Sequence, residues 1–427
     1  MKTAILSVGT ELLFGQIVNT NTVFLSQQLN LLGYDVMYHH TVGDNPGRLK
    51  EMIVDIYKEC DLIITTGGLG PTQDDLTKEM VCELFGDHLV VNERELKKLE
   101  ACFGQSGLEM TEGNRKQAYY PSNARIFENS VGTAAGFALE KDGKIIICMP
   151  GPPKEMNPMY FDEVKPYLES KQDSVIFYRT IRTFGIGESK LENKLIDLVE
   201  NQTDPTIAPY VKEGETTLRI ASKRSTLEEA EAAVADMIEK IKERAGKYIY
   251  SCDDEQLKDV VARKLVEKGL KISCAESCTG GLFAGKLIDY PGISAAFDRG
   301  FVTYTNESKH EELGVSLDTL EKFGAVSEQT AIEMARGVYN KTGSDICISV
   351  TGIAGPDGGT PEKPVGLIYI GVNYSDVLEG GNGDKRIEKY RRVQMRNFSR
   401  SWNRNYATLC MLDIVNKIIE GNTEILQ

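Results

Sequence analysis

The sequence predicts an α/β protein of several domains, and three observations support this prediction. The chain has 427 residues, which is roughly three times the usual length of a domain. Short apolar runs typical of buried strands alternate with segments of helical periodicity. Such alternation is typical of parallel sheets with helices on both faces. We therefore expect a parallel, three-layer α/β domain at the N-terminus and another α/β domain at the C-terminus.

The first expected domain covers residues 1–168. One predicted helix, 20–32, places Val23, Leu25, Leu29 and Leu32 at near-helical spacing. Buried strands are predicted where apolar residues run together and end in turn residues. The expected strands are 4–9, 34–42, 61–68 and 144–149, and the other expected helices are 48–60 and 75–85.

The second and third expected domains cover residues 171–250 and 255–427, with SCDDE (251–255) between them. The middle segment reads as a small α+β module, with strands at 174–183 and 215–224 and helices at 188–199 and 226–246. The third segment reads as α/β. Its expected helices are 257–269, 331–343 and about 400–420, and its expected strands are 271–276, 301–306, 345–351 and 365–374.

Composition and charge favour small-molecule chemistry. The net charge is −14 and the pI is about 5.0, whereas nucleic-acid binders carry a basic surface. We expect no nucleic-acid partner, although the stretch RRVQMR (391–396) could form a local basic patch. No apolar run approaches the roughly 20 residues that cross a bilayer, and no signal segment precedes the first strand. We therefore expect no membrane partner and a cytoplasmic location.

Cysteine and histidine usage excludes further classes of site. The nine cysteines include no CxxC pair, which argues against a disulfide framework or a zinc site and favours reduced, packed thiols. Only four histidines are present, so few side chains are available for a mechanism that depends on histidine.

The stretch TTGGLGPTQDDLT (65–77) follows a predicted strand and precedes a predicted helix. Its glycines leave backbone N–H groups open to an anion at the start of that helix. Two aspartates follow, and carboxylates beside a phosphate site commonly hold a divalent metal. Capping of the helix by one of them is an equally good explanation. The residues concerned are Gly67, Gly68, Gly70, Asp74 and Asp75.

This stretch, together with SVGTELLFGQIVNTNTVFLSQQL (7–29) and MPGPPKEM (149–156), resembles the molybdopterin-binding-fold domain of CinA, the competence/damage-inducible protein A family. The resemblance implies metal-dependent cleavage of ADP-ribose to AMP and ribose 5-phosphate. It implies a divalent ion (Mg, Mn or Co), with K⁺ as a possible companion, held by Asp75. It also implies a substrate site formed by Glu11, Asn21, Gly67, Gly68, Gly70 and Asp74.

The middle segment resembles the KH-like domain of CinA proteins. Its GIGES turn (185–189) is a short glycine turn, and a tight helix start explains it better than a phosphate loop. It lacks a basic GxxG loop, so we expect no RNA binding.

The stretch AESCTGG (275–281) offers several reactive groups at the end of a predicted strand. Cys278 is intrinsically the best nucleophile, but His310 is the only histidine near it in the sequence. Glu276 is suited either to general-base catalysis or to bonding the neighbouring backbone. Ser277 requires a base of another kind, and a buried lysine can serve. Lys309 is a candidate, although residue types alone favour a surface lysine there and a packed aromatic at Tyr304.

Four stretches resemble the C-terminal CinA domain, the nicotinamide mononucleotide (NMN) amidohydrolase family. They are AESCTGG, RGFVTYTNESK (299–309), GAVSEQTA (324–331) and SVTGIAGPDGGTPEKPVG (349–366). The resemblance implies that Ser277 is the nucleophile and that Tyr304 and Lys309 assist it. The implied reaction converts NMN to nicotinate mononucleotide and ammonia and requires no cofactor.

Other residues near these stretches are expected to contact the rest of the substrate. Thr279, Gly280 and Gly281 are expected to hold the oxyanion and the substrate through backbone N–H groups. A second strand-to-glycine turn, formed by Thr351, Gly352 and Gly355, suits the nucleotide phosphate. The family carries two arginines four residues apart near the C-terminal helix, and Arg400 and Arg404 have this spacing. We expect Arg400 to contact the substrate.

The whole sequence therefore predicts a bifunctional enzyme of nucleotide recycling whose partners are NMN, ADP-ribose and a second copy in a homodimer. Two alternatives stay open. One is a molybdopterin-handling protein, and the other is a regulatory protein of competence or the DNA-damage response.

Overall fold

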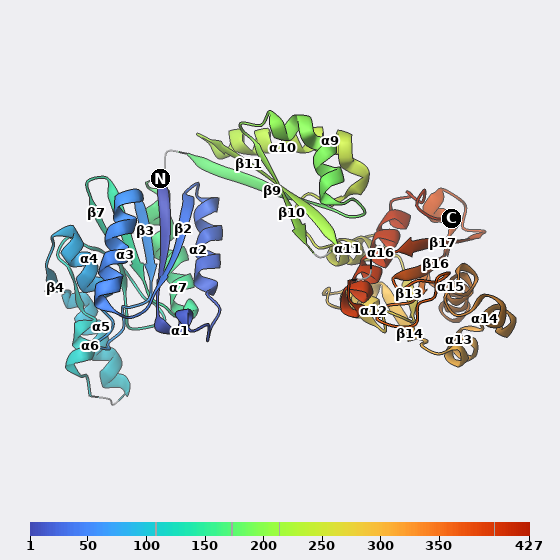
Figure 1. Ribbon diagram of the computed structural model, residues 1–427, viewed down its shortest axis with the longest axis horizontal. Coiled ribbons are helices and arrows are strands. Elements are labelled where there is room, and N and C mark those ends of the chain that lie inside the picture. Colours follow the sequence, from blue (N-terminus) through green and yellow to red (C-terminus); the bar gives the residue numbers. More distant parts are fainter. Residues whose placement is uncertain (107–108, 172–173, 213, 397) are drawn as a thin grey trace. The chain divides into compact units, whose positions relative to one another are not determined.

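The computed structural model describes residues 1–106, 109–171, 174–212, 214–396 and 398–427. The chain divides into two compact units (Figure 1). Unit 1 contains residues 1–178 and 222–233, and unit 2 contains residues 179–221 and 234–427.

The N-terminal sheet has the strand order β2-β1-β3-β8-β7-β6. Four strands are parallel: β1 (Lys2–Val8), β2 (Asp35–Val42), β3 (Leu62–Thr66) and β8 (Lys144–Met149). At one edge, β7 (Gly136–Lys141) and β6 (Arg125–Phe127) continue the sheet in antiparallel pairs. The expected parallel α/β domain is confirmed, but its sheet is mixed, because the turn at residues 142–143 reverses the chain directly into β8.

Helices cover both faces of this sheet. Residues that alternate along β1 enter different cores: Leu6 packs toward α3 (Pro46–Glu59) and α4 (Thr77–Phe85), and Ile5 packs toward α2 (Thr20–Leu31) and α7 (Pro153–Met159). The remaining elements of this domain are α1 (Thr10–Leu13), β4 (Leu89–Val91), α5 (Glu93–Ser106), α6 (Glu112–Lys116), β5 (Tyr119–Pro121), a π-helical turn (Tyr160–Val164) and α8 (Lys165–Glu169).

The helix predicted over 20–32 is confirmed as α2, which buries Leu25 and Leu29 and leaves Val23 56% exposed. One predicted helix boundary in this domain is wrong. The helix expected from residue 75 begins at Thr77, so Asp74 and Asp75 lie in the turn before it.

The middle module has the strand order β10-β11-β9-β12. Its elements are β9 (Val175–Thr183), α9 (Glu188–Glu200), β10 (Thr206–Lys212), β11 (Glu215–Arg224), α10 (Leu227–Ala245) and β12 (Ile249–Ser251). The α+β prediction holds, and β10 and β12 are additions to it.

The C-terminal sheet has the order β14-β13-β15-β16-β17. The strands β13 (Ile272–Glu276), β14 (Phe297–Val302) and β15 (Ile346–Gly352) are parallel, whereas β16 (Leu367–Ser375) and β17 (Arg386–Gln394) are antiparallel. Because β14 ends at Val302, Tyr304 lies in the loop after the strand and not within it.

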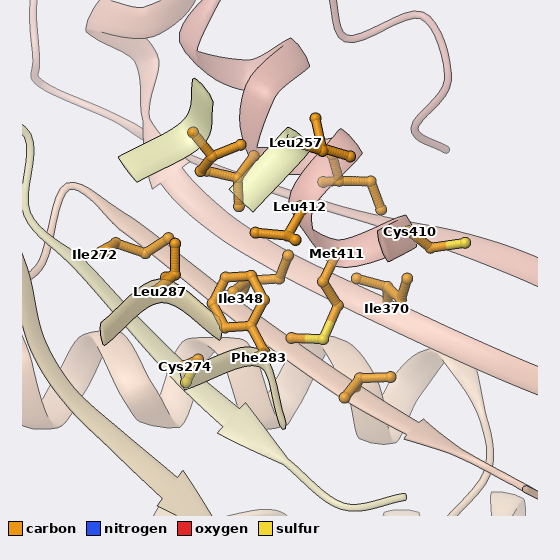
Figure 2. Close-up of a cluster of buried hydrophobic side chains, with 14 of the residues drawn as sticks. Leu257, Ile272, Cys274, Phe283, Leu287, Ile348, Ile370, Cys410, Met411 and Leu412 are labelled. Atoms are coloured by element: carbon orange, nitrogen blue, oxygen red, sulfur yellow. The ribbon is translucent and has the colours of Figure 1, made fainter. Parts of the chain in front are cut away.

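Helices cover both faces of this sheet as well. The larger core lies under α11 (Leu257–Glu267), α12 (Leu282–Ile288) and α16 (Arg400–Ile419) (Figure 2). The opposite face carries α13 (Asn306–Leu313), α14 (Leu317–Phe323) and α15 (Glu328–Thr342). Neighbouring residues of β13 divide between the two, with Cys274 in the first core and Ala275 in the second.

Candidate active sites

The stretch AESCTGG forms a tight turn at the carboxyl end of β13. The Ser277 N–H donates to the Val350 carbonyl at 3.1 Å, which ties the start of the turn to β15. Gly280 and Gly281 have φ values of 62° and 94°, a region that side chains other than glycine adopt at a cost. The chain can therefore turn from the strand into α12 and leave the Ser277 side chain, which is 8% exposed, at the sheet edge.

Glu276 holds this turn in place. Its carboxylate is almost completely buried and accepts N–H bonds from Gly281 at 3.0 Å, Phe283 at 3.1 Å and Ala284 at 2.9 Å. Three N–H donors at a helix start stabilise a buried carboxylate. Of the two sequence-based roles for Glu276, bonding to the neighbouring backbone is therefore the one that the structure shows.

Lys309 is brought to Ser277 by α13. Thr305 caps this helix in a reciprocal pair with Ser308, and Lys309 follows in the first turn. Its Nζ lies 3.1 Å from Ser277 Oγ, 2.9 Å from the Thr303 carbonyl and 3.2 Å from the Tyr304 carbonyl. The side chain is fully buried. It is therefore not the surface lysine that residue types alone favoured.

Burial lowers the pKa of Lys309 to about 8. The ammonium form is disfavoured because this group has lost water, and among the described residues no carboxylate pairs with it. A neutral amine beside a serine hydroxyl is equipped to accept the proton of that hydroxyl.

Tyr304 contacts the site through both its side chain and its backbone. Its side chain is 60% exposed, and its hydroxyl bonds to Arg400 Nη2 at 3.0 Å. The contact with Lys309 comes from the Tyr304 backbone carbonyl. The tyrosine ring thus lies at the mouth of the site, joined to Arg400 and not to the lysine amine.

Cys278 lacks the properties of a nucleophile. It is buried, and this burial raises the pKa of its thiol to about 12, so the thiolate is scarce at neutral pH. His310 bonds to the Val315 carbonyl through Nδ1 at 2.8 Å. Ser277 is therefore the better-equipped nucleophile of the turn.

The second glycine turn is only partly open to a ligand. The Thr351 hydroxyl donates to the Ala325 carbonyl at 2.7 Å. A Cβ at Gly352 would lie 2.4 Å from Ile368, so this glycine serves close packing of β15 on β16. The Gly355 carbonyl accepts from Arg400 Nη1 at 2.8 Å, and Arg400 thus joins this turn to Tyr304.

The N-terminal candidate site is a cavity of about 400 Å³ at the carboxyl ends of β1, β3 and β8. Gly67 and Gly68 bring the backbone close to its neighbours: added Cβ atoms would lie 2.2 Å from the Val8 carbonyl oxygen and 2.1 Å from Thr77 Oγ1. Carboxylates line this cavity, and no lysine or arginine does among the described residues. The acidic residues are Glu11, Asp44, Asp74, Asp75 and Glu155.

The two aspartates differ in how they are held. Asp75 Oδ2 accepts the Thr72 N–H at 3.0 Å and also the Thr72 hydroxyl, so it closes the loop before α4 and does not cap the helix. Asp74 bonds to the same hydroxyl and is solvent-exposed. Asn21 lies in an adjoining hollow, where its amide donates to the Gly151 carbonyl at 2.6 Å and to Thr66 at 2.9 Å.

Comparisons with known proteins agree across all three domains. Family models match in sequence order: a probable molybdopterin binding domain over residues 4–170, a damage-inducible protein CinA KH domain over 178–251, and a CinA C-terminal domain over 254–419. A competence-damage inducible protein of Clostridium botulinum (strain Loch Maree / Type A3) is 51% identical over 375 residues, covering 87% of this chain and 91% of that protein. The chain belongs to the CinA family.

Other similar proteins have CinA names as well. A CinA-like protein of Dictyoglomus thermophilum is 49% identical over 406 residues, covering 94% of this chain and 98% of that protein. Among solved structures, a competence/damage inducible protein from Agrobacterium tumefaciens is 39% identical, covering 38% of this chain and 96% of that chain, with a TM-score of 0.34.

In this CinA-family chain, Arg404 is a site residue whose position the sequence did not predict. Its Nε donates to the Cys278 carbonyl at 3.1 Å, and its Nη2 donates to the Thr279 carbonyl at 2.7 Å. Arg404 therefore fixes the Ser277 turn from α16, while Arg400 lies nearer the mouth of the candidate site. The four-residue spacing was the available signal, but spacing does not show which arginine faces which loop.

The N-terminal CinA cavity has suitable donors for a divalent cation. No group of three His, Cys, Asp or Glu side chains is arranged to hold a metal within the part of the chain that the structure describes. Mg²⁺, however, is usually bound by one or two carboxylates together with substrate phosphates. Asp74 and Asp75 fit such a shared site, which a diphosphate would complete.

No helix among the described residues is both long and apolar enough to cross a bilayer.

Proposed function

We propose that the C-terminal domain hydrolyses the carboxamide of NMN to a carboxylate and releases ammonia. The observation that carries this proposal is the 3.1 Å contact between Lys309 Nζ and Ser277 Oγ, made by a lysine that is fully buried. Serine–lysine pairs are an established arrangement for acyl transfer.

In the proposed reaction, neutral Lys309 accepts the proton of Ser277 as Oγ attacks the carboxamide carbon. The carbon–nitrogen bond breaks, and the lysine ammonium returns the proton to the departing ammonia. A water molecule then attacks the acyl-serine ester, and Lys309 again accepts a proton. The proton passes back to Ser277, so the enzyme ends in its starting state and one water has been consumed.

The carbonyl oxygen becomes negative during both attacks and needs N–H donors. The Gly281 N–H is not available, because it donates to Glu276. The N–H groups of Thr279 and Gly280 have no hydrogen-bond partner among the described residues. We therefore assign the oxyanion to these two donors, held by Glu276 on one side of the turn and by Arg404 on the other. The exposed Arg400 guanidinium suits the nucleotide phosphate at the mouth.

Ammonia release from NMN tests this half of the proposal. Ser277→Ala is expected to lower kcat/KM by at least about 10³-fold, whereas Cys278→Ala, its neighbour in the same turn, is expected to retain most of the activity. Circular dichroism of both variants checks that the turn has not unfolded the domain. Equal ammonia release by Ser277→Ala and wild type would exclude Ser277 as the nucleophile.

We propose further that the N-terminal domain cleaves ADP-ribose to AMP and ribose 5-phosphate with a divalent cation. The supporting observation is the cavity of glycines and five carboxylates without a basic residue among those that line it. A diphosphate in this cavity needs a cation between it and the carboxylates. When bound, the ion would neutralise the phosphates and activate water. The Gly67 N–H donates to the Met149 carbonyl at 3.0 Å, so the N–H groups of Gly68 and Gly70 are the ones that would orient the diphosphate.

Asp74→Asn is the cleaner test of this second activity, because Asp75 also closes its own loop. We expect the variant to need more metal for half-maximal cleavage of ADP-ribose, with a weaker metal-dependent rise in melting temperature as the independent readout. Ser277→Ala should cleave ADP-ribose normally. Cleavage that is unaffected by chelators and by Asp74→Asn would refute the proposal.

A further inference from the structure

Unit 2 contains a polar cavity that is lined mainly by basic side chains. It has a volume of about 330 Å³ and lies between the middle module and helices α11, α12 and α16. These three helices pack side by side (Figure 1). Four cations and one carboxylate line it, although the chain as a whole has a net charge of −14. The charged lining residues are Arg182, Lys212, Glu215, Lys258 and Lys286.

The acidic residues nearby neutralise only part of this charge. Arg182 Nε lies 2.7 Å from Asp254 Oδ1, and Arg182 Nη1 lies 4.0 Å from Glu215 Oε2. Lys258 Nζ lies 2.7 Å from Asp289 Oδ2. Lys212 and Lys286, by contrast, make no ion pair with any residue that the structure describes. The cavity therefore keeps unbalanced positive charge, which favours an anionic occupant.

Uncharged donors face the same space. The cavity reaches Gln256, Leu257 and Lys258 at the start of α11, and Gln256 makes no side-chain cap. The first N–H groups with intrahelical acceptors are those of Asp259 and Val260, which donate to the Gln256 carbonyl. The N–H groups ahead of them are left for another acceptor. Asn405 adds a side-chain amide from α16.

We propose that this cavity binds a small phosphate monoester of about the size of a phosphorylated pentose. Cations with backbone and amide donors are the groups that bind phosphate oxygens. The volume lies at the lower end of the range of roughly 300–1,000 Å³ for small-molecule sites. A phosphate with one sugar fits this volume.

The occupant would contact two elements that hold the Ser277 turn. Lys286 lies on α12, which starts directly after Gly281. Asn405 follows Arg404, whose guanidinium donates to the carbonyls of the turn. Because Lys286 lies in the last turn of α12, the end away from the Ser277 turn, a bound anion would act on this turn through the length of α12 and through α16 near Asn405. We expect it to protect α12 from hydrogen exchange.

Calorimetric titration of the full-length Ser277→Ala protein with ribose 5-phosphate tests the proposal without depending on amidase activity. Lys286→Glu, added to this background, is expected to weaken binding by at least about tenfold. Lys322→Glu is the matched control, because it makes the same charge change at an exposed residue of α14, and it should change binding by less than about twofold.

Hydrogen exchange locates the bound molecule. We expect ribose 5-phosphate to protect residues 256–259 and 282–288, and Lys286→Glu to remove this protection. Three results would overturn the proposal: unchanged binding in Lys286→Glu, equal weakening by Lys322→Glu, or protection confined to the loops around Tyr304 and Gly355. Equally tight binding of inorganic phosphate would also overturn it, because the sugar would then go unrecognised.

Discussion

Lys309 has an environment that suits a proton acceptor more than a structural cation. Its amine contacts one hydroxyl and three backbone carbonyl oxygens, those of Thr303, Tyr304 and Thr305. These oxygens orient the amine without supplying a negative charge. The neutral form is therefore accessible near physiological pH, and the amine already lies within hydrogen-bond reach of its proton donor.

The pH dependence of the proposed NMN deamidation follows from this environment. Because only neutral Lys309 accepts a proton and its pKa is lowered to about 8, kcat/KM should rise with pH and level off above that value. Initial rates measured between about pH 6 and 10 check this. Lys309→Arg should be inactive throughout, since a guanidinium does not lose its proton in this range. A flat profile for the wild type would contradict the role of Lys309.

The burial of Lys309 is not readable from residue types. The helix sequence NESKHEEL is polar almost throughout, so its pattern contains no signal for which residue faces inward. Motif resemblance named Ser277 and Lys309, and the structure brings them together. It does not bring the Tyr304 hydroxyl to them, because Arg400 lies within reach of that hydroxyl on the solvent side.

At the scale of elements, the position of α13 depends on its contact with α15. Gly337 of α15 faces the last turn of α13, and a Cβ there would lie 2.1 Å from the Leu313 carbonyl oxygen. A clash with backbone is relieved only by moving a helix. The Ser277–Lys309 distance is thus set partly by a glycine remote from the chemistry.

Gly337→Ala should therefore lower both stability and activity. We expect a loss of about 1–3 kcal/mol in the free energy of unfolding, measured by urea denaturation, and a larger fall in kcat than in KM as Lys309 moves. Gly285→Ala is the control, because its Cβ would meet nothing within 4 Å. This control should gain up to about 1 kcal/mol from its better helix propensity. Similar behaviour of the two variants would show that helix packing does not set the site.

Strong periodicity or long apolar runs made many elements predictable, and some of the missed ones, such as β17 and β12, lack both. β17 has the sequence RIEKYRRVQ, whose charged side chains tolerate an edge position beside β16. β12 has only three residues. The start of α4 was placed too early because Asp74 and Asp75 look like capping residues, whereas Asp75 closes the loop ahead of the helix.

At the scale of the whole molecule, the middle module and the C-terminal domain share a core within unit 2. Phe184 and Tyr250 of the module belong to the same buried cluster as the α16 residues, and the rings of Phe184 and Tyr406 lie 5.6 Å apart. The residues of the proposed amidase site, however, all lie between Glu276 and Arg404. The part of the chain that forms this shared core is therefore larger than the part that holds the proposed amidase site.

Two fragments distinguish what the middle module contributes to stability from what it contributes to activity. Residues 254–427 should retain NMN deamidation, since every proposed catalytic group is present. The same fragment should melt at a lower temperature than residues 179–427, because removing the module uncovers apolar surface around Tyr406. Differential scanning calorimetry and ammonia assays on both fragments check this. Loss of activity in a folded 254–427 fragment would show that the module contributes to the site.

The burial of the cysteines has a practical consequence for labelling. Of the nine, seven are buried and Cys252 is half-buried, which leaves Cys102 as the solvent-exposed thiol. Alkylating reagents react with accessible thiolates, so a maleimide dye should attach to the N-terminal domain and spare the Ser277 turn. Inactivation of NMN deamidation at the rate of dye uptake would instead point to Cys278 as an open, reactive group. Labelling of Cys278, the thiol within AESCTGG, would thus show that this turn opens to solvent.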